Sequence, residues 1–194
     1  MSTVALENKT ILVTGAAGFI GSNLVKRICE GVPSAKVVGI DSVNDYYDVA
    51  LKEFRLNELS KYESFTFIKG NIANKELITE IFSKYKPAVV VNLAAQAGVR
   101  YSITNPDAYV EANLIGFYNI LEACRHSYDD GETGVEHLVC STWNICSFNY
   151  AISLYGTVWK IHWKHLSISC NSYLGMLCCI YILYFKWLFN NLFI

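Results

Sequence analysis

Acidic residues are missing from the carboxyl-terminal part of this 194-residue sequence. All 17 aspartates and glutamates lie at or before Glu136, and residues 137–194 contain none. Tryptophan has the opposite distribution, because all four tryptophans lie between Trp143 and Trp187. The sequence therefore consists of two unlike parts that meet near residue 140.

The sequence also lacks several other features, and each absence argues against a class of protein or site. The formal net charge is −1, so a basic nucleic-acid-binding surface is not expected. The first ten residues, MSTVALENKT, lack the basic and then apolar pattern of a secretory signal. Seven cysteines at irregular spacing indicate reduced thiols in a cytoplasmic protein rather than a disulfide framework. The two histidines of HWKH, residues 162–165, have no further ligands nearby, so no metal site is predicted.

Short apolar runs rich in β-branched residues alternate with amphipathic segments before residue 140. We expect buried strands at 9–14, 36–41, 65–70, 88–94 and 135–140. We expect helices at 18–30, 48–59, 75–85 and 107–125. On the 48–59 helix, Leu51, Phe54, Arg55 and Leu59 lie along one side. This alternation predicts an α/β fold with a doubly wound parallel sheet, the Rossmann arrangement.

Three glycines, Gly15, Gly18 and Gly21, follow the first expected strand in the stretch TGAAGFIGSNLV. At the start of a helix, such glycines allow a tight turn, a close approach of a pyrophosphate to the backbone, and close packing of helix on strand. Asp41 follows Gly21 by 20 positions and ends the second strand, where a carboxylate accepts hydrogen bonds from an adenosine ribose. The pattern predicts binding of NAD rather than NADP; the alternative is a plain structural turn.

The GxxGxxG spacing resembles that of the extended short-chain dehydrogenase/reductase superfamily, which contains NAD-dependent epimerases and dehydratases that act on nucleotide sugars. Residues 39–56 and 90–126 are similar to the same segments of UDP-glucuronate 4-epimerases. The resemblance covers residues 9 to about 140. It implies a truncated NAD-binding domain at 1–140 without its sugar-binding lobe, a UDP-sugar substrate such as UDP-glucuronate, and a family that forms homodimers. Another nucleotide-sugar epimerase or a 4,6-dehydratase remains an alternative.

The resemblance also implies roles for individual residues. The pyrophosphate turn would consist of Gly15, Gly18, Phe19, Ile20 and Gly21. The adenosine would be bound by Asp41, Asn44, Asn71 and Ile72. The nicotinamide half would lie on Leu93, Ala94, Ala95 and Gln96. The sugar end would meet Arg100 and Ser102, with Arg100 pairing with a uronate carboxylate.

Catalysis in the family requires a serine or threonine after the fifth strand and a YxxxK pair on the next helix. There the tyrosine removes a hydroxyl proton, and the lysine lowers the tyrosine pKa. The candidates here are Thr142, Tyr155 and Lys160, but Lys160 follows Tyr155 at a spacing one residue too long. On a helix, the extra residue rotates the ammonium by about 100° from the tyrosine. An NAD-binding protein without catalysis, acting as an interaction partner, is therefore an alternative to an enzyme.

The apolar segment 141–194 has two competing interpretations. Residues 166–185 contain no charge and are long enough to span a membrane, which would make the segment an anchor. A shifted reading frame, a retained intron or a misjoined gene model would also produce the abrupt change of composition. In either case we expect the fifth strand to be an uncovered edge of the sheet and the chain to have low solubility.

Overall fold

The computed structural model describes residues 4–128, 134–140 and 167–170. Within these residues, six parallel strands form one sheet in the order β3-β2-β1-β4-β5-β6. The strands are β1 Thr10–Thr14, β2 Lys36–Asp41, β3 Phe65–Lys69, β4 Val89–Asn92, β5 His137–Cys140 and β6 Ser167–Cys170. The five strands predicted from the sequence are all present, and the α/β doubly wound prediction is confirmed.

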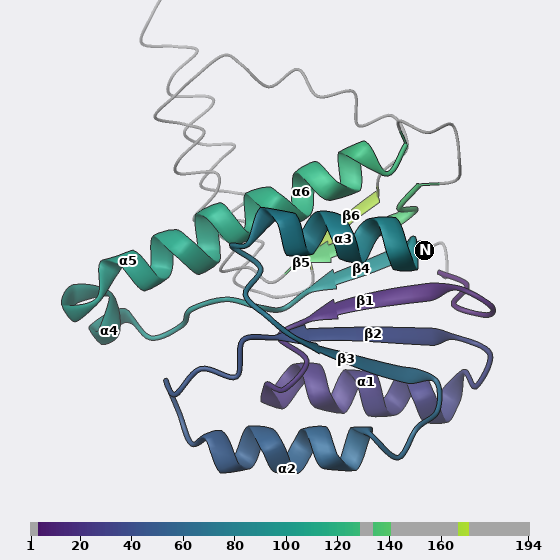
Figure 1. Cartoon of the computed structure of the whole chain (residues 1–194), viewed down its shortest axis with the longest axis horizontal. Coiled ribbons are helices and arrows are strands. Elements are labelled where there is room, and N and C mark those ends of the chain that lie inside the picture. Colours follow the sequence, from purple (N-terminus) through teal and green to yellow (C-terminus); the bar gives the residue numbers. More distant parts are fainter. Residues whose placement is uncertain (1–3, 129–133, 141–166, 171–194) are drawn as a thin grey trace, which may run out of the picture.

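Helices cover both faces of the sheet (Figure 1). One face carries α1 Phe19–Gly31 and α2 Val49–Leu59, and the other carries α3 Lys75–Tyr85 and α6 Phe117–His126. The predicted 107–125 helix is present but changes type, from α5 Pro106–Tyr109 through the π-helix η1 Val110–Gly116 to α6. A short helix, α4 Val99–Thr104, precedes it and was not predicted.

The core consists of two apolar layers separated by the sheet. On β1, Ile11 and Val13 pack into the layer that contains Val25 of α1, whereas Leu12 packs into the layer that contains Ile78 and Ile120. Successive strand residues point to opposite faces, so one fully apolar strand supplies both layers. The burial of β1 on both sides fixes the position of its carboxyl end, where the glycine turn begins.

The side of α2 that carries Leu51, Phe54, Arg55 and Leu59 is only partly buried. Leu51 is 48% exposed and Phe54 is 64% exposed, whereas Lys52 is only 4% exposed. Helix α2 lies against α1 and buries Leu59 and Lys52. The apolar residues of α2 therefore do not mark its buried side, and Lys52 has oxygen acceptors that make its burial possible, as described below.

The expectation that β5 would be an uncovered edge is also wrong. Residues 167–170 form β6, which pairs with β5 in parallel and places Cys170 opposite Cys140. These four residues lie inside the proposed membrane span 166–185, so that part of the segment is a strand and not a helix. No helix in the described residues is long and apolar enough to cross a membrane. The remainder of the proposed span lies outside the described residues.

Candidate functional site

The carboxyl ends of β1 and β4 are joined by a hydrogen-bonded pair of side chains. The hydroxyl of Thr14 donates to Oδ1 of Asn92 at 2.5 Å, and Asn92 lies opposite Thr14 in the sheet. The same hydroxyl accepts hydrogen bonds from the N–H groups of Leu93 at 3.1 Å and Ala94 at 3.0 Å. Thr14 therefore holds the start of the loop after β4 against the start of the glycine turn after β1.

Only glycine fits at two positions of the turn. Gly15 has φ +69°, and a Cβ there would lie 2.9 Å from the Ala94 nitrogen. A Cβ on Gly21 would lie 2.2 Å from the carbonyl oxygen of Gly15. The absence of both side chains lets the turn pass close to the loop after β4 and lets α1 pack directly on the turn.

Helix α1 begins without a side-chain cap. Its N-cap residue is Gly18, which has no side chain to accept a hydrogen bond from the first N–H groups. The first turn contains no acidic residue. By contrast, Asp48 caps α2 and Asn74 caps α3 through their side chains. The first N–H groups of a helix, together with its dipole, form a favourable site for an anion. The turn and the helix start thus suit a phosphate group better than the starts of α2 and α3 do.

The carboxylate of Asp41 connects this turn to the loop that follows β2. Its Oδ2 accepts a hydrogen bond from the Ala17 N–H at 3.0 Å, and its Oδ1 accepts one from the Val43 N–H at 2.8 Å. Val43 has φ +50°, a conformation that β-branched residues rarely adopt. Such strained backbone persists where neighbouring contacts enforce it, and it is concentrated at functional sites.

Lys52 fixes the same loop from the α2 side. Its ammonium donates to the main-chain oxygen and to Oδ1 of Asn44, both at 2.7 Å, and lies 4.4 Å from the centre of the Tyr47 ring. Burial lowers the pKa of the Lys52 ammonium, and the negative charges of Asp41 and Asp45 oppose this shift. We did not single out Lys52 or Tyr47 from the sequence, although both lie in the 39–56 stretch that carries the family resemblance.

The loop after β4 is held from its other side by the π-helix. The Gln96 N–H donates to Oδ1 of Asn113 at 2.8 Å, and Nδ2 of Asn113 donates back to the Gln96 carbonyl at 3.0 Å. The Tyr109 hydroxyl donates to the carbonyl of Ala97 at 2.8 Å. Insertions of π-helix are frequent at functional sites, and this one places Asn113 beside the loop.

The predicted adenine-binding residues lie after β3 and face the same region. Nδ2 of Asn71 donates to Oε1 of Glu111 at 2.8 Å, and Oδ1 of Asn71 accepts from the Ala73 N–H at 2.9 Å. Nδ2 of Asn119 donates to the carbonyls of Ile72 at 3.0 Å and Ala73 at 2.9 Å. The polar groups around Asn71 and Ile72 are therefore already ordered by the protein.

These segments line an open cavity of about 160 Å³ at the carboxyl edge of the sheet. Ten of the predicted cofactor residues line it, namely Gly15, Gly18, Asp41, Asn44, Asn71, Ile72, Leu93, Ala94, Ala95 and Gln96. The combination of glycine turn, uncapped helix start and carboxylate fits a dinucleotide, with its pyrophosphate at α1 and a ribose at Asp41.

The remaining predicted residues are not part of this lining. Phe19 and Ile20 are 71% and 68% exposed and do not line the cavity. Arg100 and Ser102 lie on α4, and their roles toward a sugar stay predictions. The catalytic candidates Thr142, Tyr155 and Lys160 lie outside the described residues.

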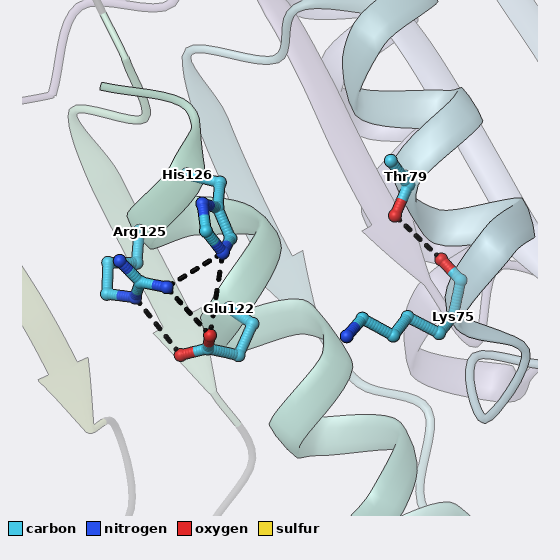
Figure 2. A network of polar contacts seen from close by, with 5 residues as sticks. All are labelled: Lys75, Thr79, Glu122, Arg125 and His126. Carbon is cyan, nitrogen blue, oxygen red and sulfur yellow. Dashed lines mark hydrogen bonds and ion pairs between the residues drawn. The ribbon is translucent and has the colours of Figure 1, made fainter. Parts of the chain in front are cut away.

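A second cavity, of about 240 Å³, lies between α3 and α6. Its charged residues include Lys75 and Glu122. Glu122 forms an ion pair with Arg125 at 2.9 Å and lies 3.6 Å from Nε2 of His126 (Figure 2). The hydrogen bond from Arg125 lowers the pKa of the Glu122 carboxyl. None of the predicted site residues lines this cavity, so the cavity at the carboxyl edge of the sheet is the stronger candidate.

A family model described as GDP-mannose 4,6 dehydratase matches residues 12–143, a segment that runs from β1 to just beyond β5. The chain belongs to this family. The match agrees with the resemblance inferred from the glycine spacing, because the segment contains the turn, Asp41 and the loop after β4.

Individual relatives match about 60–68% of the chain. Protein CapI of Staphylococcus aureus is 53% identical over 116 residues, covering 60% of this chain and 34% of its own length. A UDP-glucuronate 4-epimerase of Thermodesulfobacterium geofontis is 42% identical over 131 residues, covering 68% and 38%. The chain thus spans little more than a third of the length of these relatives.

Solved structures show the same fold. The crystal structure of UDP-glucuronic acid 4-epimerase from Bacillus cereus, in complex with UDP-glucuronic acid and NAD, matches with a TM-score of 0.60 and 32% identity. The match covers 68% of this chain and 39% of that one. UDP-glucose 4-epimerase from Thermotoga maritima, with UDP-glucose, matches with a TM-score of 0.55 and 32% identity over 68% of this chain and 37% of that one.

Proposed function

We propose that the described residues form the NAD-binding part of a nucleotide-sugar epimerase or dehydratase, with UDP-glucuronate as the sugar nucleotide. The observation that carries this proposal is the position of Asp41, whose carboxylate is bonded to the glycine turn and lines the same cavity as Gly15 and Gly18. The relatives named as UDP-glucuronate 4-epimerases support the choice of sugar.

Different residues of the chain would bind different parts of the cofactor and the substrate. The N–H groups at the start of α1 would hold the pyrophosphate, and Asp41 would accept hydrogen bonds from the adenosine ribose. When bound, NAD supplies the hydride acceptor and donor for carbon 4 of the sugar. Arg100 would pair with the uronate carboxylate, and Tyr155 with Lys160 would have to supply the base. A homodimer and a cytoplasmic location stay predictions.

A second candidate function is NAD binding without turnover. The spacing of Tyr155 and Lys160 favours it, because on one helix the extra residue would point the ammonium away from the phenol. Two measurements on the same protein sample distinguish the two candidates. NAD+ binding is measured by calorimetry, and conversion of UDP-glucuronate to its 4-epimer is then assayed. Binding with conversion supports the epimerase, and binding without conversion supports the second function. Absence of NAD+ binding contradicts both.

A further inference from the structure

The burial of Lys52 at the wall of the cavity has a chemical consequence for its neighbour, Asn44. We propose that Lys52 is a positioning residue, which turns the Asn44 amide so that its NH2 group, and not its oxygen, faces the adenosine ribose. This inference rests on the proposed function, because it assigns a role toward a nucleotide bound at Asp41.

The orientation of the amide follows from the chemistry of the ammonium. Lysine carries three donors and no acceptor, so each group within hydrogen-bond distance of it must be an acceptor. The Lys52 ammonium lies 2.7 Å from the Asn44 side chain, and the atom there is Oδ1. An amide turned the other way would place its NH2 group against the ammonium, which is repulsive. Lys52 therefore selects one of the two amide orientations.

The burial of Lys52 makes this selection strong. Lys52 is 4% exposed, and a buried charge that loses its partner is strongly destabilising. A second hydrogen bond, to the main-chain oxygen of Asn44, and the face of the Tyr47 ring hold the ammonium in place. Both the main chain and the side chain of Asn44 are thus fixed by one cation.

The resulting pair of groups is complementary to a sugar hydroxyl. Asn44 and Asp41 both line the cavity. A hydroxyl group both donates and accepts hydrogen bonds. Asp41, when ionised, only accepts, so a second acceptor from Asn44 would leave the hydroxyl oxygen without a donor. With Lys52 in place, Asp41 supplies the acceptor and Asn44 supplies the donor.

The variant that tests this proposal most sharply is Asn44→Asp. Its carboxylate still accepts from Lys52, so the fold should be retained, but the donor toward the ribose is gone. We expect calorimetry to show NAD+ and ADP-ribose binding weakened by the same factor, about two- to tenfold, because a hydrogen bond between uncharged groups contributes roughly 0.5–1.5 kcal/mol. ADP-ribose lacks nicotinamide, so equal losses assign the effect to the adenosine side.

Lys52→Met removes the cation with a side chain of similar length and should weaken both ligands by a similar factor. Lys52→Arg keeps a donor-only cation and should bind more tightly than Lys52→Met does. The matched control is Lys61→Met. Lys61 is an exposed lysine just beyond the carboxyl end of α2, it pairs with Glu58, and it does not line the cavity, so this variant should bind NAD+ with unchanged affinity. If Lys52 acts through Asn44, combining Lys52→Met with Asn44→Asp should weaken binding by less than the product of the two single losses.

The outcomes are distinct. Wild-type affinity in a folded Asn44→Asp variant overturns the role of Lys52 while leaving the proposed function intact. Independent, multiplicative losses in the double variant also overturn it. If Lys52→Met does not fold, Asn44→Asp still decides the matter, because its expected loss of affinity is measured against the wild type. Failure of the wild-type chain to bind either ligand overturns both the proposed function and the role of Lys52.

Discussion

Replacement of Gly21 by alanine has two opposite effects on stability. It raises the helix propensity of α1, and it adds a Cβ to the closely packed glycine turn. Gly21 lies in the first turn of α1, and alanine is a better helix former than glycine by about 1 kcal/mol. Propensity alone therefore predicts that Gly21→Ala stabilises the protein. The added Cβ, however, would lie 2.2 Å from the oxygen and 2.9 Å from the carbonyl carbon of Gly15, and both distances are too short for ordinary contact.

The obstacle at Gly15 is main chain, which cannot rotate away as a side chain can. Overpacking of a filled site costs about 1–3 kcal/mol, and the upper end applies where backbone has to move. After subtraction of the gain in propensity, we expect a net loss of about 2 kcal/mol in the free energy of unfolding. Because α1 and the turn have to separate, NAD+ affinity should fall in the same variant.

The matched control is Gly31→Ala in the last turn of α1, where a Cβ would meet nothing within 4 Å. This variant should be more stable than the wild type, by up to about 1 kcal/mol, with unchanged NAD+ affinity. Urea denaturation followed by circular dichroism measures both stabilities, and calorimetry measures both affinities. A Gly21→Ala protein as stable as Gly31→Ala, with wild-type NAD+ affinity, would refute the close packing of α1 on the turn.

Three further predictions concern single side chains. Asp41→Asn should weaken NAD+ binding by about 10- to 100-fold in calorimetry, since it removes the charge from a hydrogen-bonded acceptor; an unchanged affinity would place the ribose elsewhere. The hydrogen bond from Arg125 lowers the folded-state pKa of Glu122, so the stability it contributes is present above the ordinary carboxyl pKa and is lost as the pH falls through the lowered value. Glu122→Gln should therefore reduce the loss of stability between pH 7 and acid in urea titrations, and an unaltered pH profile would contradict this. Burial raises the pKa of the Cys124 thiol, which is 0% exposed, so iodoacetamide should label Cys124 in the urea-unfolded chain but not in the native one, as mapped by mass spectrometry.

The strands could be predicted because a parallel strand buried on both faces is almost continuously apolar. The β1 stretch TILVT is an example, and it is buried along nearly its whole length. The side of α2 could not be predicted, because apolar periodicity identifies a stripe without saying what covers it. Leu51 and Phe54 form such a stripe and are exposed, while Lys52 is buried because Asn44 supplies two oxygens.

Most of the cofactor cavity could be predicted because its contacts come from main chain or from residues at strand ends. Gly15 and Asp41 occupy positions where only particular residues satisfy the geometry, so the sequence carries a clear signal. Lys52 and Asn113 carry no such signal, since a lysine on a surface helix and an asparagine within a helix are ordinary residues. Their roles depend on which loop each one faces, and that is decided by tertiary packing and, for Asn113, by the π-helical turn.

The central claim is that the glycine turn and Asp41 together bind a dinucleotide at the carboxyl edge of the sheet. Amide hydrogen exchange, measured with and without saturating NAD+, tests this claim most directly because it locates the ligand as well as detecting it. Exchange should slow in peptides that span residues 14–22 and 41–45, while peptides from α3 and the end of α6 should exchange at unchanged rates. Unchanged exchange at 14–22 and 41–45, or protection confined to the cavity between α3 and α6, would contradict it.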